Sequence, residues 1–342
     1  EFFRAPPPTQ SLLEIVKVVT MTQEMGGASA KTPPARPKVV VRVGDRVFSG
    51  SARGAGIFIL AMLAAVSGFL LLEGFPAIVA DPEDISLLSG QSFWLWVGPL
   101  VFGTFWASAL GLLVAFPLAI GIALFISHYA PRRIATTLGY LVDLLAAVPS
   151  VVYGLWGAVI LAPALQPLYV WLEENLGFIP FFAGPASGTG RTILTASLVL
   201  AVMVLPIITA VSREVFLQTP VLYEEAALAL GATRWEMIRT VVLPVGRGGI
   251  ISAAMLGLGR ALGETLAVAM VLSATGVISL NLISSVNPST IAANVALSFP
   301  EAYGLNVNVL IASGLILFAI TLVVNSVARW IVNRRSEFSG AN

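Results

Sequence analysis

The 342-residue chain contains no cysteine, one histidine and three lysines, and only 11% of its residues are charged. Without cysteine, the protein has no disulfides, no thiolate metal ligands and no cysteine nucleophile. No lysine follows a glycine, so the Gly-Lys-Ser/Thr element that cradles nucleotide phosphates is not in the sequence. Soluble domains usually carry about 25% charged residues. The composition therefore argues against a soluble domain, and against a chain that hydrolyses ATP by itself.

Apolar residues make up 57% of the chain, and they gather in long runs. A helix needs roughly 20 mostly apolar residues to cross the hydrocarbon core of a bilayer. We therefore expect an all-α integral membrane protein of about six transmembrane helices, over residues 54–72, 97–126, 134–162, 192–210, 250–273 and 307–332. An amphipathic segment, residues 165–176, is expected to lie flat on the outer face of the membrane.

The first 52 residues differ in composition, because they are rich in proline and carry scattered lysines and arginines. Such a segment buries too little apolar surface to offset the entropy of ordering it. We expect a flexible cytoplasmic tail over residues 1–52, with a small hairpin over residues 38–48 as the alternative. Residues 53–335 then form the membrane domain, and residues 336–342 a short C-terminal tail.

Positive charge is concentrated in alternate connecting segments. Eight lysines and arginines precede the first span, and the loops after the second and fourth spans carry Arg132, Arg133, Arg213, Arg234, Arg239 and Arg247. The other loops are mostly acidic, and basic loops stay on the cytoplasmic side. Both termini are therefore expected in the cytoplasm, which requires an even number of spans. His128, in the loop before Arg132, is expected to be a solvated loop residue.

The loop over residues 219–246 has the pattern of two short helices. We expect Thr219 to cap the first helix, with Pro220 at its first position, where a missing N–H costs nothing. Gly231 is expected to end that helix. Thr233 and Glu236 have the spacing of a capping box at the start of the second helix, which Pro244 is expected to stop. The pattern predicts a compact, rigid projection into the cytoplasm.

This loop resembles the EAA loop of ABC importer permeases. Glu225-Ala226-Ala227 is followed after three residues by Gly231 and, after nine more, by Val241-x-Leu243-Pro244. The family usually has isoleucine at the position of Val241. The resemblance implies the fold of type I importer permeases, with cytoplasmic coupling helices that dock on a separate ATPase subunit. The implied docking residues are Glu224, Glu225, Ala226, Ala227, Gly231, Leu243 and Pro244.

Three charged residues lie well inside expected spans, away from the span ends: Asp143, Arg260 and Glu264. Each costs about 2.5–3.5 kcal/mol at the centre of a membrane helix, so such residues usually pair together or line a path. Arg260 and Glu264 are four residues apart, which places them on one helix face. They either form an ion pair that joins two helices, or Arg260 binds a passing anion while Glu264 orients it or relays a proton. Asp143 has the same two interpretations, a structural pair or a place on the path.

Residues 256–265 and 147–156 resemble phosphate importer permeases, specifically the C-type subunit of the Pst system. In that family the residues matching Arg260 and Glu264 are regarded as transport residues, and Asp143 stands where the family has an acid. The resemblance implies a multi-pass subunit of the bacterial cytoplasmic (inner) membrane that forms a path for inorganic phosphate. The implied partners are a second, A-type permease chain, ATPase subunits that bind the ATP, and an extracytoplasmic phosphate-binding protein.

Other functions stay open on the residues alone. One intramembrane arginine suits sulfate or molybdate as well as phosphate, so a permease for another oxyanion is the first alternative. A proton-coupled secondary transporter is the second, because Glu264 and Asp143 would suit proton transfer. The sequence has no metal-ligand cluster and no nucleophile–base pair, which argues against an enzyme. No cofactor is expected in this chain, since ATP would be bound by partner subunits.

Overall fold

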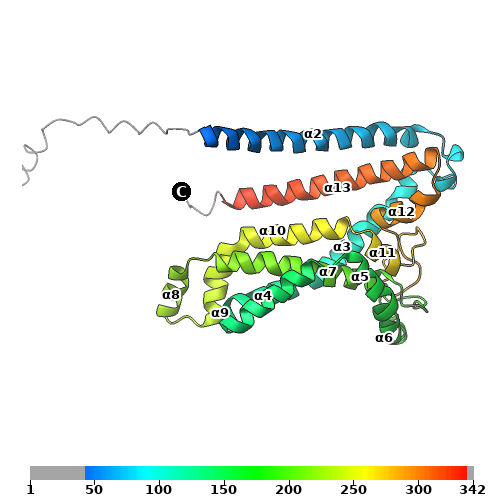
Figure 1. Ribbon diagram of the computed structural model, residues 1–342. Coiled ribbons are helices and arrows are strands. Elements are labelled where there is room, and N and C mark those ends of the chain that lie inside the picture. Colours follow the sequence, from blue (N-terminus) through cyan, green and yellow to red (C-terminus); the bar gives the residue numbers. More distant parts are fainter. Residues whose placement is uncertain (1–42, 337–342) are drawn as a thin grey trace, which may run out of the picture. The chain divides into compact units, whose positions relative to one another are not determined.

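The computed structural model describes residues 43–336, and this part of the chain is almost entirely helical (Figure 1). Six of the described helical segments are long and apolar enough to cross a membrane: Arg46–Val79, Phe93–Tyr129, Ser150–Leu176, Ile193–Leu217, Arg234–Leu262 and Leu305–Ile331. The prediction of about six membrane-spanning helices is thus confirmed. The chain divides near residue 62 into two units, of which the first contributes only the start of helix α2 to the described residues.

Helix α2 (Val43–Val79) begins earlier than the sequence predicted. Residues 43–52, expected to belong to the flexible tail, are helical and form its first turns. These residues contain no proline, and once a helix exists each further residue adds a hydrogen bond at little cost. The alternative hairpin over residues 38–48 is excluded from residue 43 onward for the same reason. The predicted tail over residues 1–42 and the tail after residue 336 lie outside the described residues.

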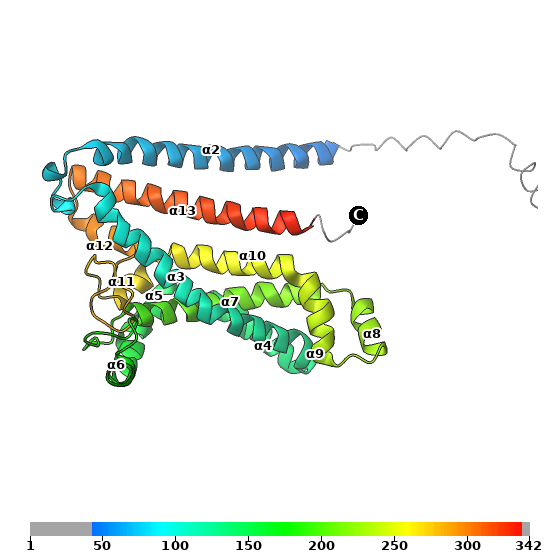
Figure 2. The same ribbon diagram turned by 180° about the vertical axis from the view of Figure 1, so that it is seen from behind.

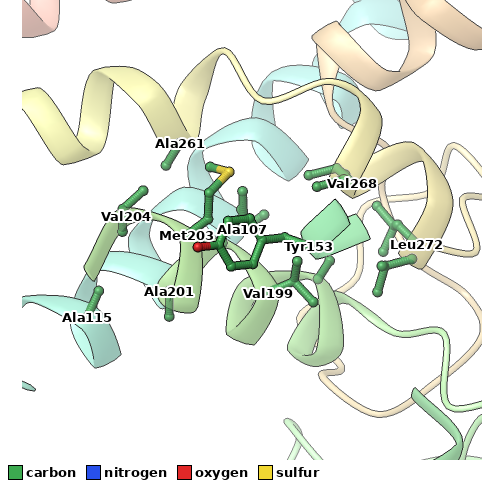
Figure 3. Packing of buried hydrophobic residues seen from close by; sticks show 14 of the residues in the cluster. Ala107, Ala115, Tyr153, Val199, Ala201, Met203, Val204, Ala261, Val268 and Leu272 are labelled. Atoms are coloured by element: carbon green, nitrogen blue, oxygen red, sulfur yellow. The ribbon is translucent and has the colours of Figure 1, made fainter. Parts of the chain in front are cut away.

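Helix α7 (Ile193–Leu217) lies at the centre of the second unit and packs against α3 (Phe93–Leu124), α4 (Arg132–Ala146) and α10 (Leu243–Leu262), as both views show (Figures 1 and 2). About 67% of its most apolar window is buried, far more than in any other candidate span. Figure 3 shows Met203 and Val204 of α7 packed among Ala107 and Ala115 of α3 and Ala261 of α10. Small residues at these contacts let the helix backbones approach closely.

The expected third span, residues 134–162, is not one continuous helix. Helix α4 ends at Ala146, and α5 (Ser150–Trp156) begins after Pro149, whose missing N–H and steric demand on Val148 interrupt the helix. A π-helical turn, η4 (Gly157–Leu161), then joins α5 to α6 (Ala162–Leu176). By length and hydropathy the third span is Ser150–Leu176, which includes the segment 165–176 that we expected to be a separate surface helix.

The fifth span also differs from the expected residues 250–273. Helix α10 ends at Leu262 with Gly263 as its C-cap, and α11 (Leu266–Val271) is a separate short helix. Apart from the elements of the loop between α7 and α10, the remaining described elements connect the spans or form the last one. They are the 3-10 turns η1 (Pro82–Asp84), η2 (Ser86–Leu88) and η6 (Phe299–Glu301), the π turn η3 (Phe125–Tyr129), and helices α12 (Ile291–Ser298) and α13 (Leu305–Ser336).

Candidate coupling helices and anion pathway

The loop after α7 forms the predicted two-helix projection, which lies at the end of the bundle opposite α6 and α11 (Figures 1 and 2). Its first helix, α8 (Val221–Ala229), has no buried residue, and the side chains of Leu222 and Leu230 are 71% and 90% exposed. Glu225 and Ala226 are exposed on the same helix. An exposed apolar surface with a carboxylate and small residues has the character of a docking site for another protein.

The ends of α8 differ partly from the sequence prediction. Pro220 is the N-cap, and the Thr219 hydroxyl is buried with no hydrogen-bond partner, so the expected Thr219 cap is wrong. The Thr219 backbone N–H donates to the carbonyl of Phe216, which keeps this residue in the turn that ends α7. Gly231 does end α8 as predicted, because its φ of +87° is a conformation that residues with a Cβ rarely adopt.

The second helix begins with the predicted capping box. The Glu236 N–H donates to the Thr233 hydroxyl at 3.3 Å, and the Thr233 N–H donates to the Glu236 carboxylate at 2.8 Å. This helix, α9 (Arg234–Met237), continues through the π turn η5 (Ile238–Val242) into α10. Pro244 therefore does not stop it. Pro244 is the second residue of α10, directly after the π turn, and its missing N–H removes one backbone hydrogen bond without ending the helix.

The predicted docking residues form two groups, one exposed to solvent and one packed against the helix bundle. Glu225 and Ala226 are exposed, whereas Leu243 and Ala227 pack against a buried cluster that includes Phe216 and Ile238. Leu243 and Pro244 are only half-buried, but they belong to the helix that carries the projection. Leu243 and Ala227 therefore hold the projection against the bundle, while the exposed residues of α8 form the accessible surface.

His128 connects the projection to the bundle. Its Nε2 lies 3.4 Å from a carboxylate oxygen of Glu224 in α8, and its Nδ1 lies 2.7 Å from the Ser127 hydroxyl. The His128 side chain is only 8% exposed, so the expectation of a solvated loop residue is wrong. His128 lies in the π turn η3 at the end of α3, and sequence spacing alone gives no signal of such a turn.

Arg260 and Glu264 do not share a helix face, contrary to the prediction. The helix ends between them at Gly263, and the ion pairs of the described residues do not include this one. Glu264 is buried, with only 8% of the residue exposed. Its carboxylate accepts the Ala267 N–H at 3.1 Å, at the start of α11. Glu264 thus stabilises the break after α10, and within the described residues the Arg260 guanidinium has no ion-pair partner.

Asp143 lies apart from these two residues. Its carboxylate is 3.9 Å from the Arg213 guanidinium of α7, and both line a cavity of about 520 Å³ with Arg132 and Tyr140. Gly139 makes room for Arg213, because a Cβ there would collide with the guanidinium. The predicted set of three pathway residues is therefore divided between two places in the structure.

Arg260 is exposed near the end of α10 and lines a larger cavity, of about 730 Å³, between α10 and α13. The cavity wall also contains Ser252, Asn325 and Arg329, none of which the sequence singled out as a site residue. A cationic cavity in a candidate membrane span suits an anionic ligand, because a buried or lipid-exposed guanidinium without a partner is costly.

The fold and the site thus define a polytopic helical membrane protein with a two-helix projection and an arginine in a spanning helix. Residues 115–337 match the family described as binding-protein-dependent transport system inner membrane component. The chain belongs to this family.

Proteins of similar sequence are consistent with this family membership. The chain is 43% identical over 299 residues to the phosphate transport system permease protein PstC 2 of Mycobacterium tuberculosis, covering 84% of this chain and 91% of that one. It is 42% identical to PstC of Mycobacterium leprae, covering 89% and 98% of the two chains. It is 39% identical to PstC of Mesorhizobium japonicum, covering 87% and 92%.

The fold resembles that of solved ABC transporter chains. One is in the crystal structure of a bacterial alginate ABC transporter in complex with an alginate pentasaccharide-bound periplasmic protein, with a TM-score of 0.58 at 17% identity, covering 85% of this chain and 95% of that one. A second structure of a bacterial alginate importer gives a TM-score of 0.52, also at 17% identity, covering 84% and 99%. The predicted type I importer permease fold is confirmed.

Proposed function

We infer that this chain is a membrane permease subunit of an ATP-driven phosphate importer. The observation that carries the proposal is the position of Arg260, a guanidinium in a candidate span that lines the 730 Å³ cavity between α10 and α13. A guanidinium offers several donors in a fixed plane, which suits the oxygens of phosphate. The relatives at 39–43% identity are named phosphate transport permeases, which supports phosphate over sulfate or molybdate.

The path is completed by other chains. The cavity beside Arg260 is open in this chain, and we propose that a second permease, a related A-type chain, covers it. An external phosphate-binding protein delivers the anion. In this arrangement Glu264 supports the path by fixing the helix break after Arg260, through its bond to the Ala267 N–H. Asp143, bound to Arg213, holds α4 against α7 and affects the path only indirectly.

ATP hydrolysis takes place in separate ATPase chains, and α8 is the docking element. Its exposed face, with Glu225, Ala226 and Leu222, fits a groove on another protein. His128 and the cluster around Phe216 then pass movement of α8 to the ends of α3 and α7. The α8–α9 end of the bundle is cytoplasmic in this proposal, as are both chain termini, and the membrane is the bacterial inner membrane.

Transport by the reconstituted complex tests the proposal. Arg260→Gln should abolish phosphate uptake into proteoliposomes that contain this chain, its partner permease, the ATPase and the binding protein. Arg247→Gln is the matched control, since Arg247 is an exposed arginine of the same helix that does not line the cavity. Both variants should still co-purify with the ATPase. Normal uptake by the Arg260 variant would remove this residue from the path.

Uptake of other oxyanions, and uptake driven by a pH gradient, test the alternative functions. Sulfate or molybdate that is itself taken up by the complex, at rates equal to phosphate, would favour a permease for another oxyanion. Uptake that follows a pH gradient in the absence of ATP would favour a proton-coupled transporter.

A further inference from the structure

The cavity that contains Arg260 holds a second guanidinium, that of Arg329 on α13. Helices α10 and α13 pack together and run in opposite directions, as both views show (Figures 1 and 2). Arg260 lies near the C-terminal end of α10, and Arg329 lies near the C-terminal end of α13. The two arginines therefore stand towards opposite ends of one cavity rather than beside each other.

Polar groups occupy the wall between the two arginines. Ser252 and Arg260 are eight residues apart on α10, about 12 Å at 1.5 Å per residue. Asn325 and Arg329 are four residues apart on α13, which places both on one face of that helix. Ala328 and Gly259 are the small residues at the wall and leave it open. The polar groups thus line the cavity along the helices and not at a single point.

Neither arginine is neutralised by a carboxylate within the described residues. The ion pairs found there join His128 to Glu224 and Arg213 to Asp143, and neither involves a residue of this cavity. No aspartate or glutamate lines the cavity. Two cations facing one cavity repel each other unless an anion or water lies between them, so the arrangement favours a small anion with several acceptor oxygens.

We propose that Arg329, with Asn325, forms a second anion-binding station in the cavity, and that an oxyanion moves between this station and Arg260. The inference rests on the proposed function and adds a residue to it. A second station lowers the barrier to leaving Arg260, because an ion crosses a pathway faster when it moves between sites of moderate affinity than when one site holds it tightly. Asn325 donates to the anion through its amide and adds no charge.

The absence of cysteine from this chain makes a direct test of charge possible. Arg329→Cys, in the complete complex in proteoliposomes, should reduce the rate of ATP-dependent phosphate uptake about tenfold, the usual effect of losing a charge-assisted hydrogen bond. Treatment with aminoethyl methanethiosulfonate, which restores a positive charge, should recover most of the rate. The sulfonatoethyl reagent, which adds a negative charge, should not. The same reagents on the complex with the unmodified chain report any effect on partner cysteines.

Arg247→Cys is the control for loss of a positive charge elsewhere on α10, and should keep its uptake with or without either reagent. Free phosphate should protect Arg329→Cys against both reagents in vesicles of zwitterionic lipid. Protection that requires anionic lipid and not free phosphate would show that the cavity binds a lipid headgroup, and would overturn the inference.

Unchanged uptake in Arg329→Cys, or equal recovery with both reagents, would also overturn it. The result for Arg260→Gln separates the role of Arg260 from that of the second station at Arg329. If Arg260→Gln abolishes uptake and Arg329→Cys does not reduce it, only the second station fails. If both variants transport normally, neither arginine lies on the path, whereas a lack of ATP-dependent phosphate uptake by the unmodified complex would overturn the proposed function itself.

Discussion

Replacement of Glu264 distinguishes a structural role from a transport role for this buried carboxylate. Its oxygen accepts the Ala267 N–H at 3.1 Å, in the first turn of the six-residue helix α11, and so does for this N–H what a capping side chain does, although the N-cap residue is Thr265. Glu264→Ala removes this acceptor and leaves a buried N–H without a partner. Loss of an N-terminal cap usually costs about 1 kcal/mol, within a range of about 0.5–2 kcal/mol. Glu264→Gln keeps an acceptor oxygen of similar reach, so we expect it to cost less than half as much.

Thermal unfolding of the purified chain in detergent, followed by tryptophan fluorescence, measures this difference. A change of 1 kcal/mol moves the midpoint by about 2–4 °C in domains somewhat smaller than this one, so Glu264→Ala should unfold about 2 °C below the unmodified chain. Uptake measured on the same variants then tests whether transport requires the negative charge of Glu264. If Glu264→Gln has the midpoint of the unmodified chain and transports normally, the carboxylate acts only as a cap. If Ala and Gln are equally stable, the capping argument is refuted.

Three further predictions concern the projection. Ala226→Trp should abolish co-purification of the ATPase while leaving the chain in the membrane, because a large side chain prevents close approach at the exposed face of α8; retained binding would place the docking surface elsewhere. His128→Ala removes the contact between the bundle and Glu224 of α8. ATPase binding should persist, while phosphate uptake per ATP hydrolysed falls several-fold. An unchanged ratio of uptake to hydrolysis would show that movement passes by another route. Gly231→Val forces a β-branched residue to a φ of +87°, at a cost of about 1–3 kcal/mol, and should weaken ATPase binding; Gly231→Asn, which tolerates this conformation, is the control and should bind normally.

The elements that sequence predicted well are those with strong local signals. The six apolar runs give the number of spans, and the spacing of Thr233 and Glu236 gives the capping box. Gly231 ends α8 because a positive φ is a local requirement of the backbone. In each case the interaction that fixes the structure lies within a few residues of the chain.

The parts that sequence could not predict depend on π turns and on contacts between distant residues. The π turns η3, η4 and η5 follow or join α-helical segments, and hydropathy has no signal for an extra residue in a turn. His128 reaches Glu224 across 96 positions of sequence. Arg329 was not among the candidate site residues, although Asn325, four residues earlier, places a second polar residue on the same face of α13.

The central claim is that an ATPase bound to α8 drives an anion past Arg260. Phosphate uptake into proteoliposomes containing the complete complex measures it, with ATP either hydrolysable or replaced by a non-hydrolysable analogue. We predict uptake with ATP, and only background with the analogue or with Arg260→Gln. Equal uptake in the absence of hydrolysis, or by this chain reconstituted alone, would contradict the account.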